Sequence, residues 1–151
     1  MSIAQQLHKN TVFPDLTQDT KDAVIQFMAE QAQHESAELS EVQDLFSRIM
    51  QHEAQSSTAI GNGIALPNVK IEGLAEQKLF LGRSRLGIDF GAVDNKPVHL
   101  IFLLVSPSQE PEKHCKSMAG ISKLLHNSQF RDQLMKAKDQ EEIISLVQKF
   151  S

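Results

Sequence analysis

A chain of 151 residues with a net charge of -4, 40% hydrophobic and 23% charged residues has the composition of one folded globular unit. It contains no Trp or Tyr, and its Lys and Arg residues are scattered, so it lacks the basic stripe and the aromatic platform of nucleic-acid-binding proteins. We therefore expect a single domain over residues 1–151 and no nucleic-acid partner.

Two helices are predicted in the first third of the chain. Over residues 20–33 apolar side chains recur at steps of three and four, which places them on one helix face. Ser40 and Gln43 then have the spacing of a capping box, so a second helix is expected to begin at Ser40. Its apolar stripe fades near His52.

The middle of the chain predicts strands. A short extended piece is expected over residues 64–66, before a proline. The run "KLFLGRSRLGIDF" alternates, which predicts a strand with one buried face and a wet end at Arg83 and Arg85. Val98–Val105 is almost continuously apolar, as in a central strand that helices cover on both faces. At eight residues it is too short to insert into a membrane, which takes about 20.

Three further helices are predicted at the end of the chain. Pro111 suits the first turn of the first, Ser128 can cap the second, and Asp139 with Glu142 can open the third. Two helices, a group of strands and three helices indicate an α/β fold, with a single mixed β-sheet sandwiched between helices. Strand order does not follow from the sequence.

The segment "SSTAIGNGIALPNVK" interrupts these periodic patterns. Its glycines and small polar residues can present backbone N–H groups and hydroxyls to an anion. The alternative is a tight turn between helix and strand, and local composition alone favours the turn. The candidate phosphate-binding residues of this segment are Ser57, Thr58, Gly61, Asn62, Gly63 and Lys70. For Lys70 itself, we favour a solvated lysine at a strand end.

Three ordered blocks resemble one known family, the enzyme IIA of the fructose- and mannitol-type sugar phosphotransferase system. They are "STAIGNGIALPNVK", "GIDFGAVDNKPVHLIFLLVSP" and "KHCKSMAGISKLL". The stretch "VDNKPV" is closer to the nitrogen-regulatory branch than to the sugar-transport branch. The resemblance spans nearly the whole chain, and it implies the mannitol-type fold.

In this family, a histidine after the proline accepts a phosphoryl group from the carrier HPr or its nitrogen-branch equivalent, and passes it on. That position is Asn68 in this chain. A neutral imidazole has a nitrogen lone pair that can attack phosphorus, whereas a carboxamide nitrogen shares its lone pair with the carbonyl. Asn68 can therefore keep the contacts of a histidine but cannot form a useful phosphoramidate.

Two more positions differ from the family pattern. His52 stands where the family has an arginine that neutralises phosphoryl oxygens, and Val69 replaces a small residue next to the acceptor. His114 matches the second histidine, which positions the phosphorylated one. The resemblance thus implies a catalytic group at Asn68, His114 and His52, of which positions 68 and 52 are degenerate.

The leading hypothesis is a regulatory enzyme IIA-like protein that cannot be phosphorylated and that contacts an HPr-like phosphocarrier or a regulatory target. The first alternative is an active phosphotransferase that uses His114 or His52 as acceptor. The second is a small-anion sensor that binds a sugar phosphate without transferring it.

The remaining histidines and the cysteine suggest no further site. His99 is expected to be a hydrogen-bonded core or edge residue. The other three, His8, His34 and His126, are expected at the surface. Cys115 is expected to pack inward and, as the single cysteine, forms no internal disulfide. No metal ligand spacing and no signal-peptide core are present, so we expect no cofactor and a cytoplasmic location.

Overall fold

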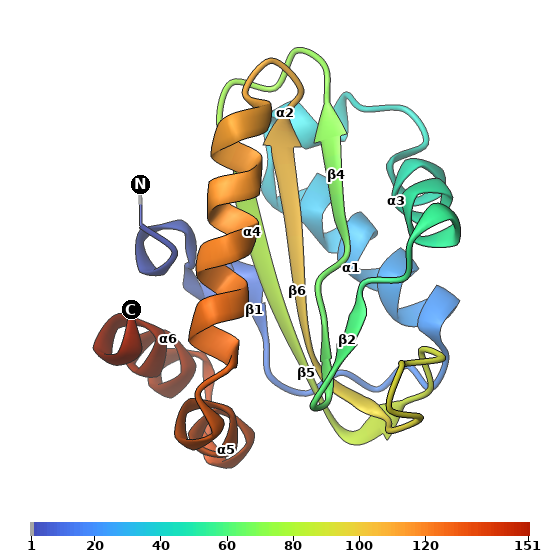
Figure 1. The fold of residues 1–151 in the computed structure, drawn as a ribbon. Coiled ribbons are helices and arrows are strands. Elements are labelled where there is room, and N and C mark those ends of the chain that lie inside the picture. The colour runs from blue at the N-terminus through green and yellow to red at the C-terminus, as the bar shows by residue number, and fades with distance from the viewer. Residues whose placement is uncertain (1) are drawn as a thin grey trace.

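Six strands form one mixed sheet in the computed structural model, which describes residues 2–151 (Figure 1). The strands are β1 (Val12–Phe13), β2 (Ala59–Gly61), β3 (Ile64–Ala65), β4 (Asn68–Ile71), β5 (Lys78–Ile88) and β6 (Val98–Pro107). Their order is β1-β5-β6-β3-β2, and β4 pairs with the C-terminal half of β6. The pairs β5–β6 and β2–β3 are antiparallel, whereas β1–β5, β3–β6 and β4–β6 are parallel.

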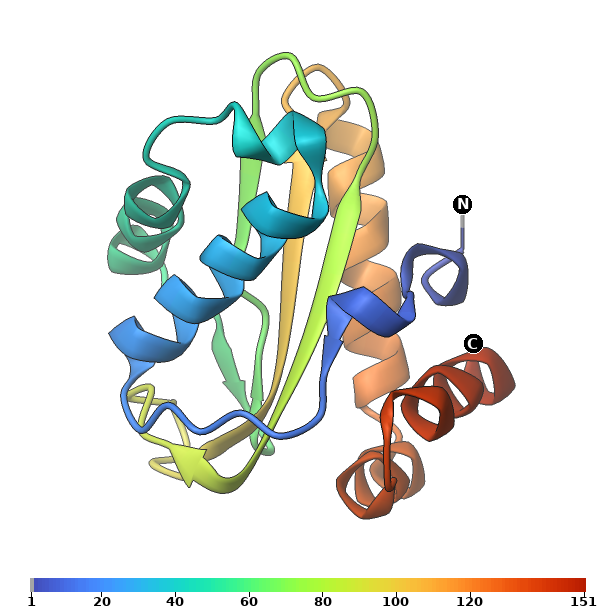
Figure 2. The same cartoon turned by 180° about the vertical axis from the view of Figure 1, so that it is seen from behind.

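Helices cover both faces of this sheet. They are the short 3-10 turns η1 (Ala4–Gln6) and η2 (Lys9–Thr11), and the helices α1 (Lys21–Glu35), α2 (Ala37–Ser40), α3 (Leu45–Gln55), α4 (Pro111–Leu125), α5 (Ser128–Lys136) and α6 (Gln140–Phe150). In Figure 1, α4 lies in front of the sheet. In Figure 2, the view from behind, α1 and α2 lie across the opposite face. The prediction of a mixed sheet sandwiched between helices is confirmed.

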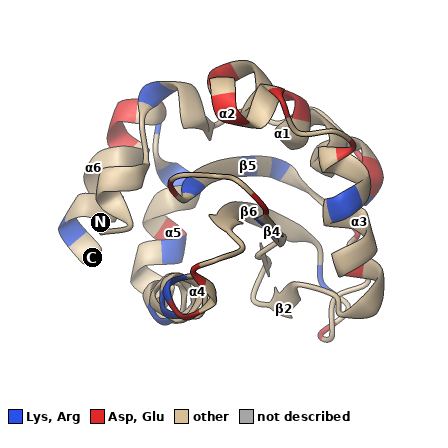
Figure 3. Cartoon of the chain, turned by 90° about the horizontal axis from the view of Figure 1, so that it is seen from above, with Lys and Arg blue, Asp and Glu red and all other residues tan. Residues whose placement is uncertain are grey.

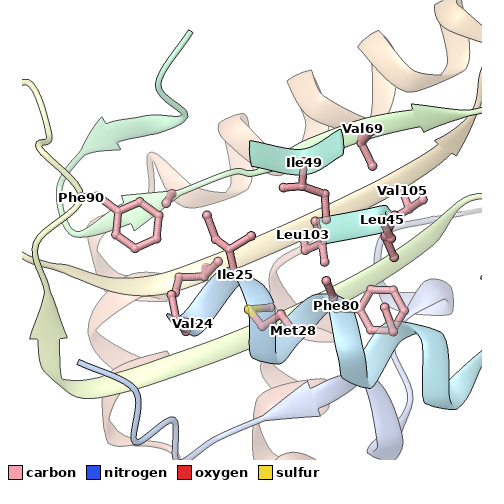
Figure 4. Close-up of a cluster of buried hydrophobic side chains, with 14 of the residues drawn as sticks. Val24, Ile25, Met28, Leu45, Ile49, Val69, Phe80, Phe90, Leu103 and Val105 are labelled. Carbon is pink, nitrogen blue, oxygen red and sulfur yellow. The ribbon is translucent and has the colours of Figure 1, made fainter. Parts of the chain in front are cut away.

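The sheet separates two clusters of buried apolar side chains. Figure 4 shows the cluster between the sheet and α1 to α3, where Leu103 and Val105 of β6 meet side chains of α1 and α3. On the other face, Phe102 and Leu104 of the same strand pack with α4, α5 and α6. Because successive strand residues point to opposite faces, β6 contributes to both clusters. The prediction of a central strand covered on both sides is confirmed.

The prediction of a polar, exposed end for β5 is confirmed at Arg85 but was wrong at Arg83. Every residue from Leu79 to Ser84 is buried, and Arg83 is only 1% exposed. Alternation suggested one wet face, but α1 lies on one side of β5 and the C-terminal helices lie on the other. The Arg83 guanidinium is buried because it donates to backbone oxygens of Pro14 (3.0 Å), Leu134 (2.7 Å) and Ala137 (2.6 Å).

The start of the second predicted helix was also wrong. Ser40 ends the short helix α2, and α3 begins only at Leu45. The Gln33 side chain donates to the carbonyl oxygens of Leu39 in α2 and Val42 in the following connection, which holds the chain in a turn after α2. Asp44 then adopts a left-handed conformation (φ 57°), which breaks the helical path that the capping-box spacing suggested.

The other helix starts agree well with the sequence. Thr20 caps α1, Pro111 lies in the first turn of α4, and the Asp139 side chain accepts from the backbone of α6. One cap is displaced by a residue, because Asn127 and not Ser128 accepts the first free N–H groups of α5.

Charge is distributed unevenly over the elements. Viewed from above, α1 and α2 carry mainly acidic side chains, while α4 carries both signs (Figure 3). None of the helices in residues 2–151 has the length and apolar character needed to cross a bilayer.

Candidate functional site

Asn68 and His114 meet where β4 and α4 begin. Asn68 is the first residue of β4, and the strand pairing places it beside Leu104 in the C-terminal half of β6. The chain leaves β6 at Pro107 and turns into α4 at Pro111, which returns His114 to the same end of the sheet. The His114 Nε2 atom lies 3.0 Å from Asn68 Oδ1. Two residues 46 positions apart in the sequence are thus in direct contact.

The polarity of this contact follows from its neighbours. Asn68 Nδ2 donates to the carbonyl oxygen of Leu66 (2.9 Å), which can only accept. The amide oxygen therefore faces His114, and Nε2 must carry the proton. The other ring nitrogen, Nδ1, lies 2.6 Å from Ser106 Oγ, so in a neutral ring it accepts the hydroxyl proton. Both ring nitrogens are engaged.

The His114 ring is held in its neutral form. The side chain is 5% exposed, and burial lowers its pKa below the usual 6.5. The nearby positive charges of Lys70 and His52 lower the pKa further. At neutral pH, His114 is therefore an N–H donor toward residue 68 and not a cation.

Ser106, His114 and Asn68 have the connectivity of a nucleophile, a base and an orienting residue. A reacting serine must, however, be reached by its substrate. Ser106 has no exposed surface in the fold. The chain of hydrogen bonds is therefore an internal network and not a hydrolytic triad.

A cavity of about 350 Å³ opens beside Asn68. Its wall combines candidates from the glycine-rich segment with apolar residues of α4; it is lined by His52, Ser56, Ser57, Thr58, Ile60, Leu66, Asn68, Met118, Ala119 and Ser122. The structure therefore brings together four of the residues that the sequence suggested, namely Asn68, His52, Ser57 and Thr58. The Nδ1 atom of His52 is buried and has no hydrogen-bond partner in the described part of the chain.

Gly61, Asn62 and Gly63 do not line this cavity, although Ile60, the residue before them, does. Gly61 ends β2, and Asn62 and Gly63 form the turn to β3. Ile64, the first residue of β3, pairs with Leu100 of β6, four residues and about 13 Å along this strand from the partner of Asn68. The turn does hold an anion, but that anion belongs to the chain, because the Asn62 N–H donates to the Asp94 carboxylate at 3.0 Å. This bond and a second from Lys96 N–H lower the pKa of Asp94.

Glu53 is a buried residue of the site that the sequence reasoning did not assign. Its carboxylate forms an ion pair with Lys21 Nζ at 2.8 Å, and it accepts from both the hydroxyl and the backbone N–H of Thr58. It therefore joins the starts of α1 and β2 to the end of α3. The signal was a carboxylate directly after His52 in a segment with few charges.

Comparison with known proteins places the chain in a family. A model described as "Phosphoenolpyruvate-dependent sugar phosphotransferase system, EIIA 2" matches residues 5–150. The chain belongs to the EIIA type-2 family. This agrees with the resemblance carried by the three sequence blocks.

Its relatives include both transport and regulatory proteins. The fructose-specific EIIABC component of Bacillus subtilis is 30% identical over 97% of this chain, which spans 23% of that protein's length. The nitrogen regulatory protein of Bradyrhizobium diazoefficiens is 31% identical over 97% of this chain and 95% of its own. The solved nitrogen regulatory protein IIA-Ntr of Neisseria meningitidis has the same fold, with a TM-score of 0.86 at 23% identity, over 96% of this chain and 98% of its own.

Two other candidates flank the site of this EIIA type-2 domain. Val69 is buried and points into the cluster under α1 and α3, away from the side of the sheet that holds His114. Lys70 is exposed on β4, beside Ser106 in the pairing with β6, and it acts on His114 through its charge. Lys70 makes no ion pair within residues 2–151.

The remaining expectations for this EIIA type-2 chain have mixed outcomes. His99 donates from Nδ1 to the carbonyl oxygen of Ser84 (2.8 Å), as a hydrogen-bonded strand residue should, and the three histidines expected at the surface are exposed. The expectation for Cys115 was wrong. Its side chain is exposed, because the residue before it, His114, occupies the inward position on α4.

Proposed function

We propose that this EIIA type-2 protein is regulatory and does not accept a phosphoryl group at position 68. It acts by contact with an HPr-like phosphocarrier or with a regulatory target protein. The observation that carries the proposal is the contact between Asn68 and His114, in which a carboxamide lies where the family has its acceptor histidine.

The chemistry of the amide supports this proposal. Phosphoryl transfer to a nitrogen acceptor needs a free lone pair in line with the leaving atom of the donor. The Asn68 nitrogen has its lone pair delocalised into the carbonyl, and its N–H group is bound to the Leu66 carbonyl oxygen. Its oxygen faces His114. No atom of Asn68 is therefore available as a nucleophile.

An active phosphotransferase with a displaced acceptor is the second candidate, and His52 has more support for that role than His114. His114 has both ring nitrogens in hydrogen bonds and is nearly fully buried. His52 lines the cavity beside Asn68, with Nε2 as the ring nitrogen left for a phosphoryl group because Nδ1 is buried. Against this role, a shift of about 1 Å in the acceptor can cost about a hundredfold in rate.

The small-anion sensor has the least support. It relied on the N–H groups of the glycine-rich turn, and the Asp94 carboxylate already accepts from the central one, Asn62. An external phosphate at that turn would lie against a carboxylate.

Incubation with a phosphorylated HPr-like carrier tests the proposal. We expect no acid-labile phosphate on any histidine by mass spectrometry. The triple variant Asn68→His, His52→Arg, Val69→Gly restores the family pattern and should become labelled. The matched control keeps Asn68 and carries only the other two changes, and it should stay unlabelled. Stoichiometric label on the unmodified chain would refute the proposal, and label on His52 would establish the second candidate.

A further inference from the structure

The hydrogen bonds around His114 run in one direction and end at Ser106. The Leu66 carbonyl accepts from Asn68, Asn68 accepts from His114 Nε2–H, and His114 Nδ1 accepts from the Ser106 hydroxyl. A backbone carbonyl has no proton to give, so it fixes the direction of every bond after it. Ser106 is the last member of this series; it lies in the second family block, but the resemblance assigned it no role.

Ser106 is well placed to hold the ring. It lies on β6, the central strand, and its side chain has no exposed surface. His114 projects from α4 onto this strand, so the 2.6 Å contact joins its ring to the most buried strand of the sheet. Without the hydroxyl, Nδ1 would be a buried acceptor with no partner, and the ring would be held at one nitrogen only.

One nitrogen contact does not define a ring orientation. An imidazole held only at Nε2 can swing about its Cβ–Cγ bond, which displaces the N–H from its partner. Two contacts on opposite sides of the ring, at Nε2 and Nδ1, remove that freedom. The same two contacts also select the neutral tautomer with the proton on Nε2.

We propose that Ser106 is a positioning residue of the site, which holds His114 with its Nε2–H directed at residue 68. In the present chain this donor binds the Asn68 amide. With a histidine at position 68, the same donor would be directed at the acceptor ring or at the oxygens of a phosphoryl group on it.

Nitrogen NMR of the His114 ring tests the proposal directly. In the full chain we expect a protonated, pyrrole-type signal at Nε2 and an unprotonated, hydrogen-bonded pyridine-type signal at Nδ1. Ser106→Ala should move the Nδ1 signal to that of a free pyridine-type nitrogen and speed the exchange of the Nε2 proton with water. Ser106→Thr, which keeps the hydroxyl, should preserve the native signals.

Two further variants separate positioning from simple loss of packing. Ser84→Ala removes another buried serine, on the neighbouring strand β5, and should leave the His114 signals unchanged. Ser106→Cys keeps the shape with a weaker donor and should give an intermediate Nδ1 shift, which covers the case in which Ser106→Ala does not fold. Native signals in either Ser106→Ala or Ser106→Cys would overturn the proposal, as would an equal change in Ser84→Ala.

A second experiment measures the rate of phosphorylation, and it rests on the proposed function and on the triple variant. In the triple variant of positions 52, 68 and 69, adding Ser106→Ala should slow labelling about tenfold or more, and adding Ser106→Thr should not. Equal labelling rates for the Ala and Thr forms would contradict positioning by Ser106. If the triple variant accepts no phosphate, the repair has failed. The NMR signals of His114 in the chain with Asn68 then still test the role of Ser106.

Discussion

At the scale of single residues, Asn68 combines an unreactive amide with hydrogen bonds at both of its polar atoms. A buried polar group is costly unless it is hydrogen-bonded, and Asn68 satisfies both ends of its amide, toward Leu66 and toward His114. An apolar replacement would leave the His114 N–H without a partner. Under the proposed function, an amide at the acceptor position is therefore compatible with a well-ordered interior, because it satisfies its own hydrogen bonds and that of His114.

Asn68→Asp should raise the pKa of His114. A carboxylate in contact with Nε2–H favours the imidazolium, whereas the native surroundings disfavour it. In the native chain the folded-state pKa lies below that of the unfolded chain, so stability falls as the pH drops below about 6.5. In the variant this loss should shrink or reverse. An NMR titration of the His114 ring measures the pKa; Asn127→Asp at the exposed cap of α5 is the control, and an unchanged or lower value in Asn68→Asp would contradict the prediction.

The sequence could predict which residues form the site better than how they are linked. The motif blocks placed Asn68 and His114 in one site, and the two are in contact. The roles of Ser106 and the Leu66 carbonyl were not predictable. They depend on the lengths and directions of hydrogen bonds, which the spacing of residues in the sequence does not give. The turn at Gly61 to Gly63 was predicted to attract an anion, but the partner, Asp94, lies 32 residues from Asn62.

At the scale of elements, Glu53 holds the backbone and side chain of Thr58, one residue of the cavity wall. This one carboxylate links α1, α3 and the segment that enters β2 through Lys21 and Thr58. The Glu53 side chain is 1% exposed, while that of Lys21 is 23% exposed, so the carboxylate is shielded from solvent and the ammonium group only partly so. Buried pairs of this kind are costly to break, because the remaining charge stays partly desolvated.

Glu53→Gln should lower the free energy of unfolding by about 2 kcal/mol, because Lys21 loses its partner while the Thr58 contact can persist. Urea denaturation at neutral pH measures the change. Glu112→Gln, at an exposed position of α4, should change stability by less than about 0.5 kcal/mol. Equal effects of the two substitutions would show that the Glu53 contacts contribute nothing specific.

The helix ends show what local sequence can and cannot specify. Asp139 caps its helix as predicted, because a cap needs only residues within one turn, and Thr20 caps α1 at the start of the predicted range 20–33. The failure at Ser40 has a different origin. There Gln33, on the previous helix, binds the backbone of the connection and overrides a capping pattern that was locally sound.

At the scale of the whole molecule, Arg83 fastens the two ends of the chain to the sheet. Its guanidinium has no carboxylate partner among the described ion pairs and instead donates to backbone oxygens directly after β1 and at the C-terminal end of α5. Burial lowers its pKa, with the Arg85 charge as a second cause, yet an arginine remains charged at neutral pH. Alternation along β5 predicted the opposite exposure, because a strand pattern does not show which helices will cover its polar end.

Arg83→Met should cost about 3 kcal/mol or more of unfolding free energy, since it leaves several buried carbonyl groups without donors. Arg83→Lys should recover only part of this, because a single ammonium cannot reproduce the planar fork. Hydrogen exchange should report the largest loss of protection in α5 and α6. Arg85→Met is the matched control, as the Arg85 side chain is half exposed with contacts of 3.4 Å and 3.5 Å, and a similar loss there would argue against a special role for Arg83.

The exposure of Cys115 has a practical consequence. It is the single cysteine of the chain, and it follows the buried His114 on the helix that forms one wall of the Asn68 cavity. A thiol-reactive fluorophore would attach at this one place without any engineering of the chain. Docking of another protein over the cavity could then be followed by the change in emission, with no isotope and no phosphate involved.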